Sequence, residues 1–152
     1  MNNFFKKKYI NYFLINLIIL LDFYTKKLIL KKIKINHIKK ILSILNFFYI
    51  KNYGLIFGIF SKKILQYHYL YKINIFIIFI IIFLIYYFFK KKKIQNFAFI
   101  FLIGGSIGNL IDRIKNGFII DFIDLHYKNF HFPTFNISDI SISLGLIALL
   151  LK

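Results

Sequence analysis

The acidic residues of this chain are few and gathered in one region. Among 152 residues only five are Asp or Glu, and four of them, Asp112, Asp121, Asp124 and Asp139, lie between positions 112 and 139. Two carboxyl groups held close together and partly shielded from water do not both ionise easily, so they share a proton. One can then act as a base toward water while the other acts as an acid toward a carbonyl or a leaving amine. This is the chemistry of an aspartic protease.

Asp121 and Asp139 are the stronger candidates for such a pair, because no cationic residue stands beside either of them in the sequence. Asp112 directly precedes Arg113, and an ion pair that stabilises the fold is the simpler interpretation there. The residue pattern alone does not separate Asp121 from Asp112 as the partner of Asp139, since both flank the turn predicted at Asn116-Gly117.

The sequence lacks residues that thiol-dependent and metal-dependent catalysis require. The chain contains no cysteine, which excludes disulfides, thiolate catalysis and cysteine metal sites. Its histidines do not have the spacing of zinc ligands, and His126 and His131 are expected to lie at a membrane interface. We therefore expect no metal and no cofactor.

The composition indicates the environment in which these carboxylates are held. The chain is 59% hydrophobic, with a mean hydropathy of +0.68, and a soluble core of this size could not bury so much apolar surface. The net charge of +17 does not indicate nucleic-acid binding, because the lysines cluster at the ends of apolar runs, at Lys6-Lys7-Lys8 and from Lys90 to Lys93. There they would contact anionic lipid head groups. The sequence predicts an integral membrane protein.

Four apolar stretches predict membrane-spanning helices within a single domain. The first resembles a signal peptide but has no small-residue cleavage site, so we interpret it as a retained helix. By the positive-inside rule, the two tight lysine clusters place the N-terminus and the end of the second span in the cytoplasm, and four spans then place the C-terminus there too. The approximate spans are residues 9–28, 70–89, 97–114 and 136–151.

The polar residues of these helices are expected near the outer membrane face. Asp22 and Lys26 lie four residues apart at the end of the first span, where an ion pair and a functional role are both open. The small residues Gly104, Gly105, Ser106 and Gly108 would let the third helix approach its neighbours closely. The third helix is expected to end with polar side chains emerging on the outer side, at Asn109, Asp112 and Arg113.

The segments between the helices complete the predicted fold. Residues 41–60, around Asn52-Tyr53-Gly54, have the pattern of strand and turn, and we interpret them as a small sheet or re-entrant segment at the interface. Residues 118–134 are expected to form an external connection that Pro133 closes, and Asn136 and Asp139 would share one face of the last helix. The predicted fold class is an all-α membrane protein with four transmembrane helices and a small extracytoplasmic β-rich cradle.

Four sequence boxes follow one another along nearly the whole chain. They are Asp22-Phe23-Tyr24-Thr25-Lys26, Asn52-Tyr53-Gly54-Leu55-Ile56-Phe57-Gly58, Gly104-Gly105-Ser106-Ile107-Gly108-Asn109-Leu110-Ile111-Asp112-Arg113 with Ile120-Asp121-Phe122 after it, and Phe132-Pro133-Thr134-Phe135-Asn136-Ile137-Ser138-Asp139. In type, spacing and order they resemble the motifs of the lipoprotein signal peptidase (signal peptidase II) family, the bacterial membrane aspartyl proteases. Ser138 replaces the family's usual Ala, and Leu55-Ile56 are bulkier than usual.

The resemblance implies a function and a set of site residues. The catalytic dyad would be Asp121 and Asp139. The substrates would be prolipoproteins that carry diacylglycerol on a cysteine, and cleavage would fall just before that cysteine. The enzyme would be a monomeric, multi-pass protein of the bacterial inner membrane, in contact with the membrane lipids. Its active site would lie near the extracytoplasmic face. The implied supporting residues are Asn109, Asp112, Arg113, Asn136, Asn52, Gly54, Asp22 and Lys26.

A non-enzymatic membrane protein is the alternative, for example a small ion or proton carrier that uses the aspartates as a relay. A relay requires carboxylates at intervals through the depth of the membrane. This chain gathers them near one face and has none from Ile73 to Phe89, which favours the protease. A family member that has lost its activity is disfavoured because the aspartates are intact.

Overall fold

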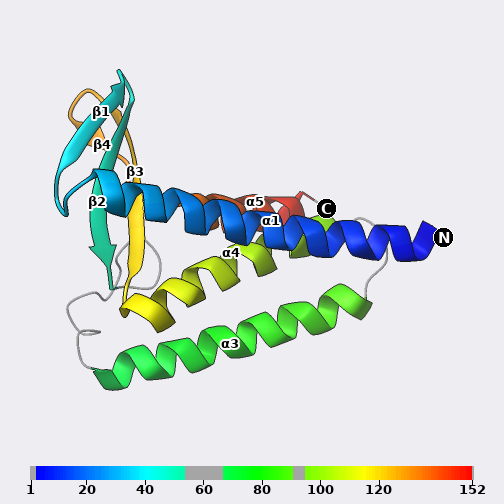
Figure 1. Ribbon diagram of the computed structural model, residues 1–152. Helices are drawn as coiled ribbons and strands as arrows, with labels where there is room; N and C mark the ends of the chain where they lie inside the picture. Colours follow the sequence, from blue (N-terminus) through cyan, green and yellow to red (C-terminus); the bar gives the residue numbers. More distant parts are fainter. Residues whose placement is uncertain (1–2, 54–66, 91–94, 152) are drawn as a thin grey trace.

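The computed structural model describes residues 3–53, 67–90 and 95–151. In this part of the chain, four helices lie side by side and a small sheet crosses one end of them (Figure 1). The helices are α1 (Asn3–Lys32), α3 (Tyr67–Lys90), α4 (Gln95–Asn116) and α5 (Ile137–Leu150). The C-terminal ends of α1 and α4 and the N-terminal end of α5 meet at the sheet.

Helix α4 packs against each of the other three helices. Its small residues allow the close approach that the sequence predicted. A Cβ atom added at Gly105 would lie 2.5 Å from the backbone oxygen of Ser138 in α5, and one at Gly104 would lie 3.1 Å from the side chain of Ile18 in α1. The helices therefore pack almost backbone to backbone where α4 meets α5.

This packing makes a specific prediction about two neighbouring glycines. We expect Gly105→Ala to lower the free energy of unfolding by about 3 kcal/mol, because the new methyl group would collide with backbone that cannot move aside. Gly104→Ala should change it by less than about 1 kcal/mol, since its contacts with the Ile18 side chain, at 3.1 to 3.2 Å, are relieved by a shift of a few tenths of an ångström. Thermal unfolding in detergent measures both, and equal losses at the two positions would contradict the packing.

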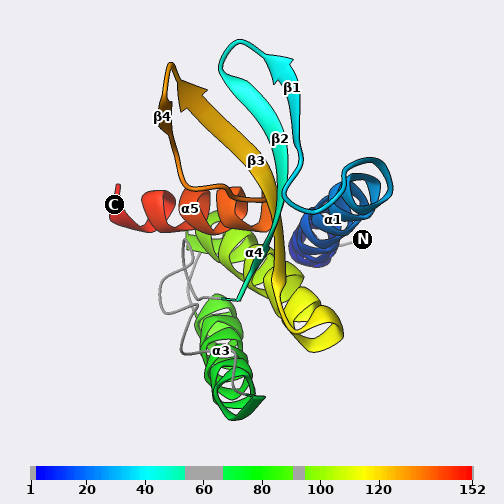
Figure 2. The same cartoon turned by 90° about the vertical axis from the view of Figure 1, so that its left-hand side faces the viewer.

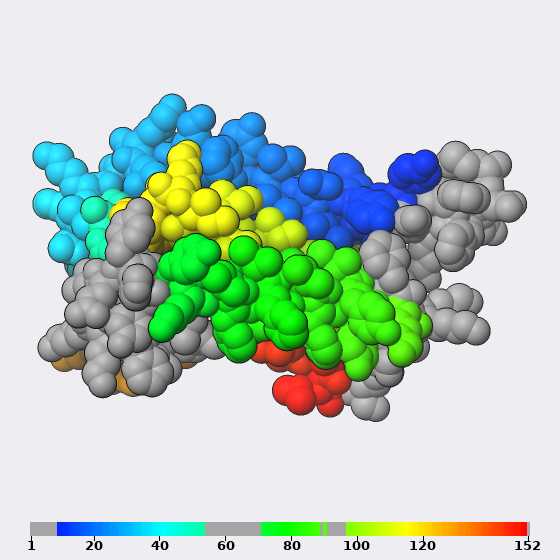
Figure 3. Space-filling view, turned by 90° about the horizontal axis from the view of Figure 1, so that it is seen from below, coloured from blue at the N-terminus to red at the C-terminus, as the bar shows by residue number. Residues whose placement is uncertain are grey.

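Two of the described helices are long and apolar enough to cross a membrane, over Tyr71–Phe88 in α3 and Phe97–Asn116 in α4. Only 11% of the α3 window is buried inside the molecule, and Figure 3 shows α3 lying exposed along one face. Helix α5 is apolar but only 14 residues long. Helix α1 contains no such window, since it carries Asp22 and several lysines. The four expected spans therefore stay a prediction.

The sheet is antiparallel, with the strand order β1-β2-β3-β4. Its strands β2 and β3 run across the helix ends (Figure 2). Apolar residues of α1, β2 and β3 form a buried cluster between the helices and the sheet, made up of Ile29, Ile33, Tyr49, Ile120 and Phe122. The strands are β1 (Ile38–Leu42), β2 (Leu45–Asn52), β3 (Ile119–Tyr127) and β4 (Phe130–His131).

Strands β1 and β2 confirm the sheet expected within residues 41–60, of which residues 54–60 lie outside the described part. Residues 118–134 connect α4 to α5 as expected, and most of this connection forms β3 and β4, which the sequence did not predict. The first four residues of β3 are all buried, since the strand lies between β2 and the helices. This burial removes the alternation of apolar and polar residues by which a half-exposed strand is recognised.

Candidate active site

Lys26 is the centre of a buried polar network although it lies in an apolar helix. Its exposed fraction is 2%, and its Nζ lies 2.6 Å from Asp22 Oδ2, 2.9 Å from Asp112 Oδ2 and 3.2 Å from Asn109 Oδ1. The structure shows an ion pair between Asp22 and Lys26, which was one of the two interpretations left open for them. For Asp112 the interpretation was an ion pair with its neighbour Arg113, and the structure shows an ion pair of Asp112 with Lys26.

The two carboxylates bound to Lys26 also fix backbone. Asp22 Oδ1 accepts a hydrogen bond of 2.9 Å from the backbone N–H of Ser138, at the start of α5. Asp112 Oδ2 accepts one of 3.1 Å from the backbone N–H of Ile120, in β3. Asp22 therefore connects α1 to α5, the helix that carries Asp139. Asp112 connects α4 to β3, the strand that carries Asp121.

Asp139 is positioned by the start of its own helix. Asn136 is the N-cap residue of α5, and its side chain accepts a hydrogen bond from the backbone N–H of Asp139 while Asp139 Oδ2 accepts one from the backbone N–H of Asn136. This reciprocal capping box fixes both side chains. The other oxygen of Asp139 accepts a bond of 2.8 Å from Asn109 Nδ2.

Asp121 is 2% exposed and accepts hydrogen bonds from two amides. Asn136 Nδ2 lies 2.7 Å from its Oδ1, and Asn52 Nδ2 lies 2.9 Å from its Oδ2. The same Asn136 Nδ2 donates to Asn109 Oδ1 at 3.2 Å, which uses both of its hydrogens. Asn136 is therefore in contact with both candidate catalytic aspartates at once.

Burial raises the pKa of Asp121, and the nearby charge of Asp139 raises it further, to about 7. Hydrogen bonds from Asn52 and Asn136, and the charge of Lys26, act in the opposite direction but more weakly. Near neutral pH, therefore, a substantial fraction of Asp121 carries a proton while the rest is ionised. This is the protonation state that a shared-proton pair requires.

The raised pKa predicts how stability depends on pH. Because the pKa of Asp121 is above its ordinary value of 3.8, the contribution of this group to stability is complete below pH 4 and is lost as the pH rises through 7. Asp121→Asn should therefore stabilise the protein relative to wild type by on the order of 3 kcal/mol more at pH 8 than at pH 4. Melting temperatures of both proteins at the two pH values measure this, and a gain that does not depend on pH would contradict it.

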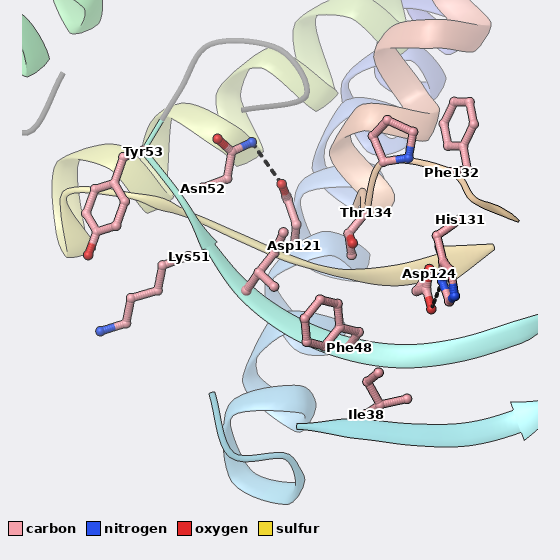
Figure 4. Close-up of a pocket in the computed structure, with 12 residues that line it drawn as sticks. Ile38, Phe48, Lys51, Asn52, Tyr53, Asp121, Asp124, His131, Phe132 and Thr134 are labelled. Carbon is pink, nitrogen blue, oxygen red and sulfur yellow. Dashed lines mark hydrogen bonds and ion pairs between the residues drawn. The ribbon is translucent and has the colours of Figure 1, made fainter. Parts of the chain in front are cut away.

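Two cavities open on either side of the aspartates. The first, of about 490 Å³, lies along the sheet and is lined by Asp121, while the second, of about 380 Å³, lies between α3, α4 and α5 and is lined by Asp139. Asn52 lines both cavities. Figure 4 shows the first cavity, with the bond from Asn52 to Asp121. A peptide that passed from one cavity into the other would cross the two carboxyl groups.

The structure brings together nearly all the residues that the sequence singled out. Arg113 lines the same cavity as Asp139, and only Gly54 lies outside the described residues. Asn109, Asp112 and Arg113 were expected to emerge on the outer side, but each is less than 10% exposed, because β3 folds back over the end of α4. The sequence pattern gave no role to the backbone of Ser138, or to the contact between Asp124 and His131.

Ser138 itself is fully buried, and its Oγ makes no hydrogen bond within the described part of the chain. An unsatisfied buried hydroxyl destabilises the folded state. We expect Ser138→Ala to raise the free energy of unfolding by about 1 kcal/mol. Chemical denaturation of both proteins would check this value, and a loss of stability would show that the hydroxyl has a partner in solution.

A pair of carboxyl groups at the end of apolar helices, Asp121 buried and Asp139 half-buried, is the arrangement of a membrane aspartic peptidase. A family model for signal peptidase (SPase) II matches residues 14–152. The chain is 46% identical to the lipoprotein signal peptidase of Buchnera aphidicola subsp. Schizaphis graminum, over 95% of this chain and 92% of that protein. It is 34% identical to the lipoprotein signal peptidase of Pasteurella multocida, over 83% and 77% respectively.

A solved structure described as a bacterial membrane enzyme has the same fold, with a TM-score of 0.80 and 30% identity, over 93% of this chain and 90% of that one. The chain belongs to the signal peptidase II family.

Proposed function

We propose that this chain is an aspartic endopeptidase that removes the signal peptide from diacylglyceryl-modified prolipoproteins, cutting just before the lipidated cysteine, with Asp121 and Asp139 as its dyad. The family match and the curated relatives, which are named lipoprotein signal peptidases, support the activity. The observation that carries the choice of dyad is the position of Asn136, which donates to Asp121 and exchanges two hydrogen bonds with Asp139.

In this mechanism the ionised carboxylate of the pair takes a proton from a water molecule, whose oxygen attacks the scissile carbonyl. The protonated carboxyl group donates its proton to the carbonyl oxygen, which gives a neutral tetrahedral intermediate. The first carboxyl group then passes its proton to the leaving nitrogen as the C–N bond breaks, and the intermediate's hydroxyl returns a proton to the second. The amides of Asn52, Asn109 and Asn136 hold the two carboxyl groups in place throughout.

We further propose that α1, α3, α4 and α5 all cross the bacterial inner membrane as the spans predicted above, and that the sheet lies on the extracytoplasmic face. The substrate would then move laterally from the bilayer into the site until its scissile bond reaches the dyad. The enzyme would act as a monomer surrounded by membrane lipids. The gathering of Asp22, Asp112, Asp121 and Asp139 at one end of the helices supports a hydrolytic site. A carrier that relays protons requires carboxylates along the whole membrane depth.

The direct test is cleavage of a diacylglyceryl-modified prolipoprotein in detergent or bilayers, read as a shift on a gel. The matched control is the same precursor with its cysteine replaced by serine, which cannot carry the thioether-linked lipid. We expect the purified protein to cleave the first precursor and leave the second intact. Failure to cleave the lipidated precursor, by protein shown to be folded, would refute the proposed function.

A further inference from the structure

The cavity along the sheet contains a second polar cluster that the proposed mechanism does not use. Asp124 is 2% exposed, and its Oδ1 and Oδ2 lie 2.8 Å and 3.0 Å from His131 Nδ1. Asn46 Nδ2 donates to Asp124 Oδ2 at 2.9 Å, and the ring of His126 stacks on that of His131 with 5.0 Å between centroids. Figure 4 shows Asp124 further along β3 than Asp121, with His131 of β4 beside it, on the same cavity.

These contacts fix the orientation of the His131 ring and the position of its proton. With both Asp124 oxygens beside Nδ1, the neutral ring carries its hydrogen on Nδ1, and Nε2 is then a hydrogen-bond acceptor. The side chain of His131 is 48% exposed and lines the cavity. Among the described residues, none forms a hydrogen bond with Nε2, so a ligand in the cavity can reach it.

The two cavities differ in the part of a substrate that suits them. The cavity beside Asp139 is lined mainly by apolar residues of the helices, such as Phe76, Ile80 and Leu146, and it fits the apolar signal peptide that precedes the cut. The cavity beside Asp121 lies along the sheet, beyond the helix ends, and its lining combines polar residues such as Lys51 and Thr134 with apolar ones such as Phe48 and Pro133. It fits the chain that follows the cut and leaves the membrane.

We propose that His131, oriented by Asp124, binds the backbone of the substrate on the mature side of the cut by accepting a hydrogen bond from a backbone N–H. Asp124 lies three residues after Asp121 in β3, and a strand rises about 3.3 Å per residue, which gives roughly 10 Å. An extended substrate spans the same distance in three residues. His131 therefore binds the N–H of the third residue after the cut, where the lipidated cysteine is the first. This inference rests on the proposed function.

The test compares substrates that differ only after the cut. The short substrate ends at the lipidated cysteine, the long one continues for four more residues, and a third has the long sequence with an ester in place of the amide N–H of its third residue. Values of kcat and KM are measured at pH 8 for wild type, His131→Ala, His131→Gln and His37→Ala. His37 is an exposed histidine in the short link before β1 and does not line the cavity, so it serves as the matched control.

We expect His131→Ala to raise KM for the long substrate about five-fold, the size of one lost hydrogen bond, with kcat and the KM for the short substrate unchanged. Wild type should show the same rise on the ester substrate, and His131→Ala should show no further rise. His131→Gln should recover part of the loss, because its amide oxygen also accepts a hydrogen bond. His37→Ala should behave as wild type on all three.

Other outcomes overturn the proposal. If His131→Ala impairs cleavage of the short and the long substrate equally, the histidine only stabilises the pairing of β4 with β3. If wild type is insensitive to the ester, no N–H of the third residue is bound. If wild type cleaves the long substrate and His131→Ala matches it, this inference fails while the proposed function stands. If wild type cleaves none of the lipidated substrates, both fail.

Discussion

Asp121→Asn and Asp139→Asn are each expected to reduce kcat for prolipoprotein cleavage by at least about 10⁴-fold, because removal of one member of a catalytic unit costs nearly as much as removal of all of it. An amide in place of the first carboxylate can neither take the proton of the attacking water nor return it to the leaving nitrogen, and an amide in place of the second cannot protonate the carbonyl oxygen. The hydrogen bonds from Asn52, Asn109 and Asn136 hold the two carboxyl groups in place. Single-turnover cleavage of a lipidated precursor, read on a gel, measures the loss.

Asp112→Asn is the matched control for this experiment. Its carboxylate is 2.9 Å from Lys26 Nζ and accepts a hydrogen bond from the backbone of Ile120, so it is used for structure. We expect this variant to be less stable and to keep measurable cleavage at low temperature. Cleavage by Asp121→Asn at a rate similar to wild type, together with complete loss in Asp112→Asn, would transfer the catalytic role to Asp112.

The comparison of these variants resolves a choice that the residue pattern alone left open. Asp112 and Asp121 flank the same turn at Gly117, and the local sequence distinguishes them only by the Arg113 that follows Asp112. The two aspartates differ in their contacts with residues that lie far away in the sequence. Lys26 reaches Asp112 and Asn52 reaches Asp121, across separations of 86 and 69 positions. Such contacts are set by the tertiary fold and leave no periodic signal in either segment.

The helices were more predictable than the sheet for a related reason. The apolar runs of α3 and α4 are long, and their composition alone predicts membrane helices. In β3, the apolar residues around Asp121 are buried on both faces, so they show neither the period of a helix nor that of a half-exposed strand. Its pairing with β2, which sets Ile50 opposite Asp121, brings together segments that lie far apart in the sequence.

Some contacts in the structure could be predicted from the spacing of residues within one segment. The spacing of Asp22 and Lys26 indicated an ion pair as one of two interpretations, and that of Asn136 and Asp139 placed them together at the start of α5. Helix α1 nevertheless extends from Asn3 to Lys32, beyond the predicted span of 9–28. The charged pair does not end the helix, because Asp112 and Asn109 of α4 complete the environment of the lysine.

Lys26→Met is expected to destabilise the protein more than any other single change to the buried network, by about 3–5 kcal/mol. The substitution keeps the length of the side chain and removes its charge. Asp22 and Asp112 would then lie buried, 1% and 8% exposed, without their shared cation. Since Asp22 binds the start of α5 and Asp112 binds β3, we also expect the two aspartates of the proposed dyad to lose their alignment and cleavage to fall at least 100-fold. Denaturant unfolding in detergent and cleavage of the lipidated precursor measure the two effects.

A double variant shows whether buried charge is the cause. Asp112→Asn added to Lys26→Met removes one of the two uncompensated carboxylates, and the amide oxygen can still accept the hydrogen bond from Ile120. We expect the double variant to be more stable than Lys26→Met alone, by about 1–3 kcal/mol, so that the two changes are strongly non-additive. Lys27→Met, one position along the same helix at an exposed site, is the matched control and should change the free energy of unfolding by less than about 0.5 kcal/mol. Additive losses in the double variant would mean that Lys26 stabilises the fold through its packing and not through the two carboxylates that join α1 to the rest of the site.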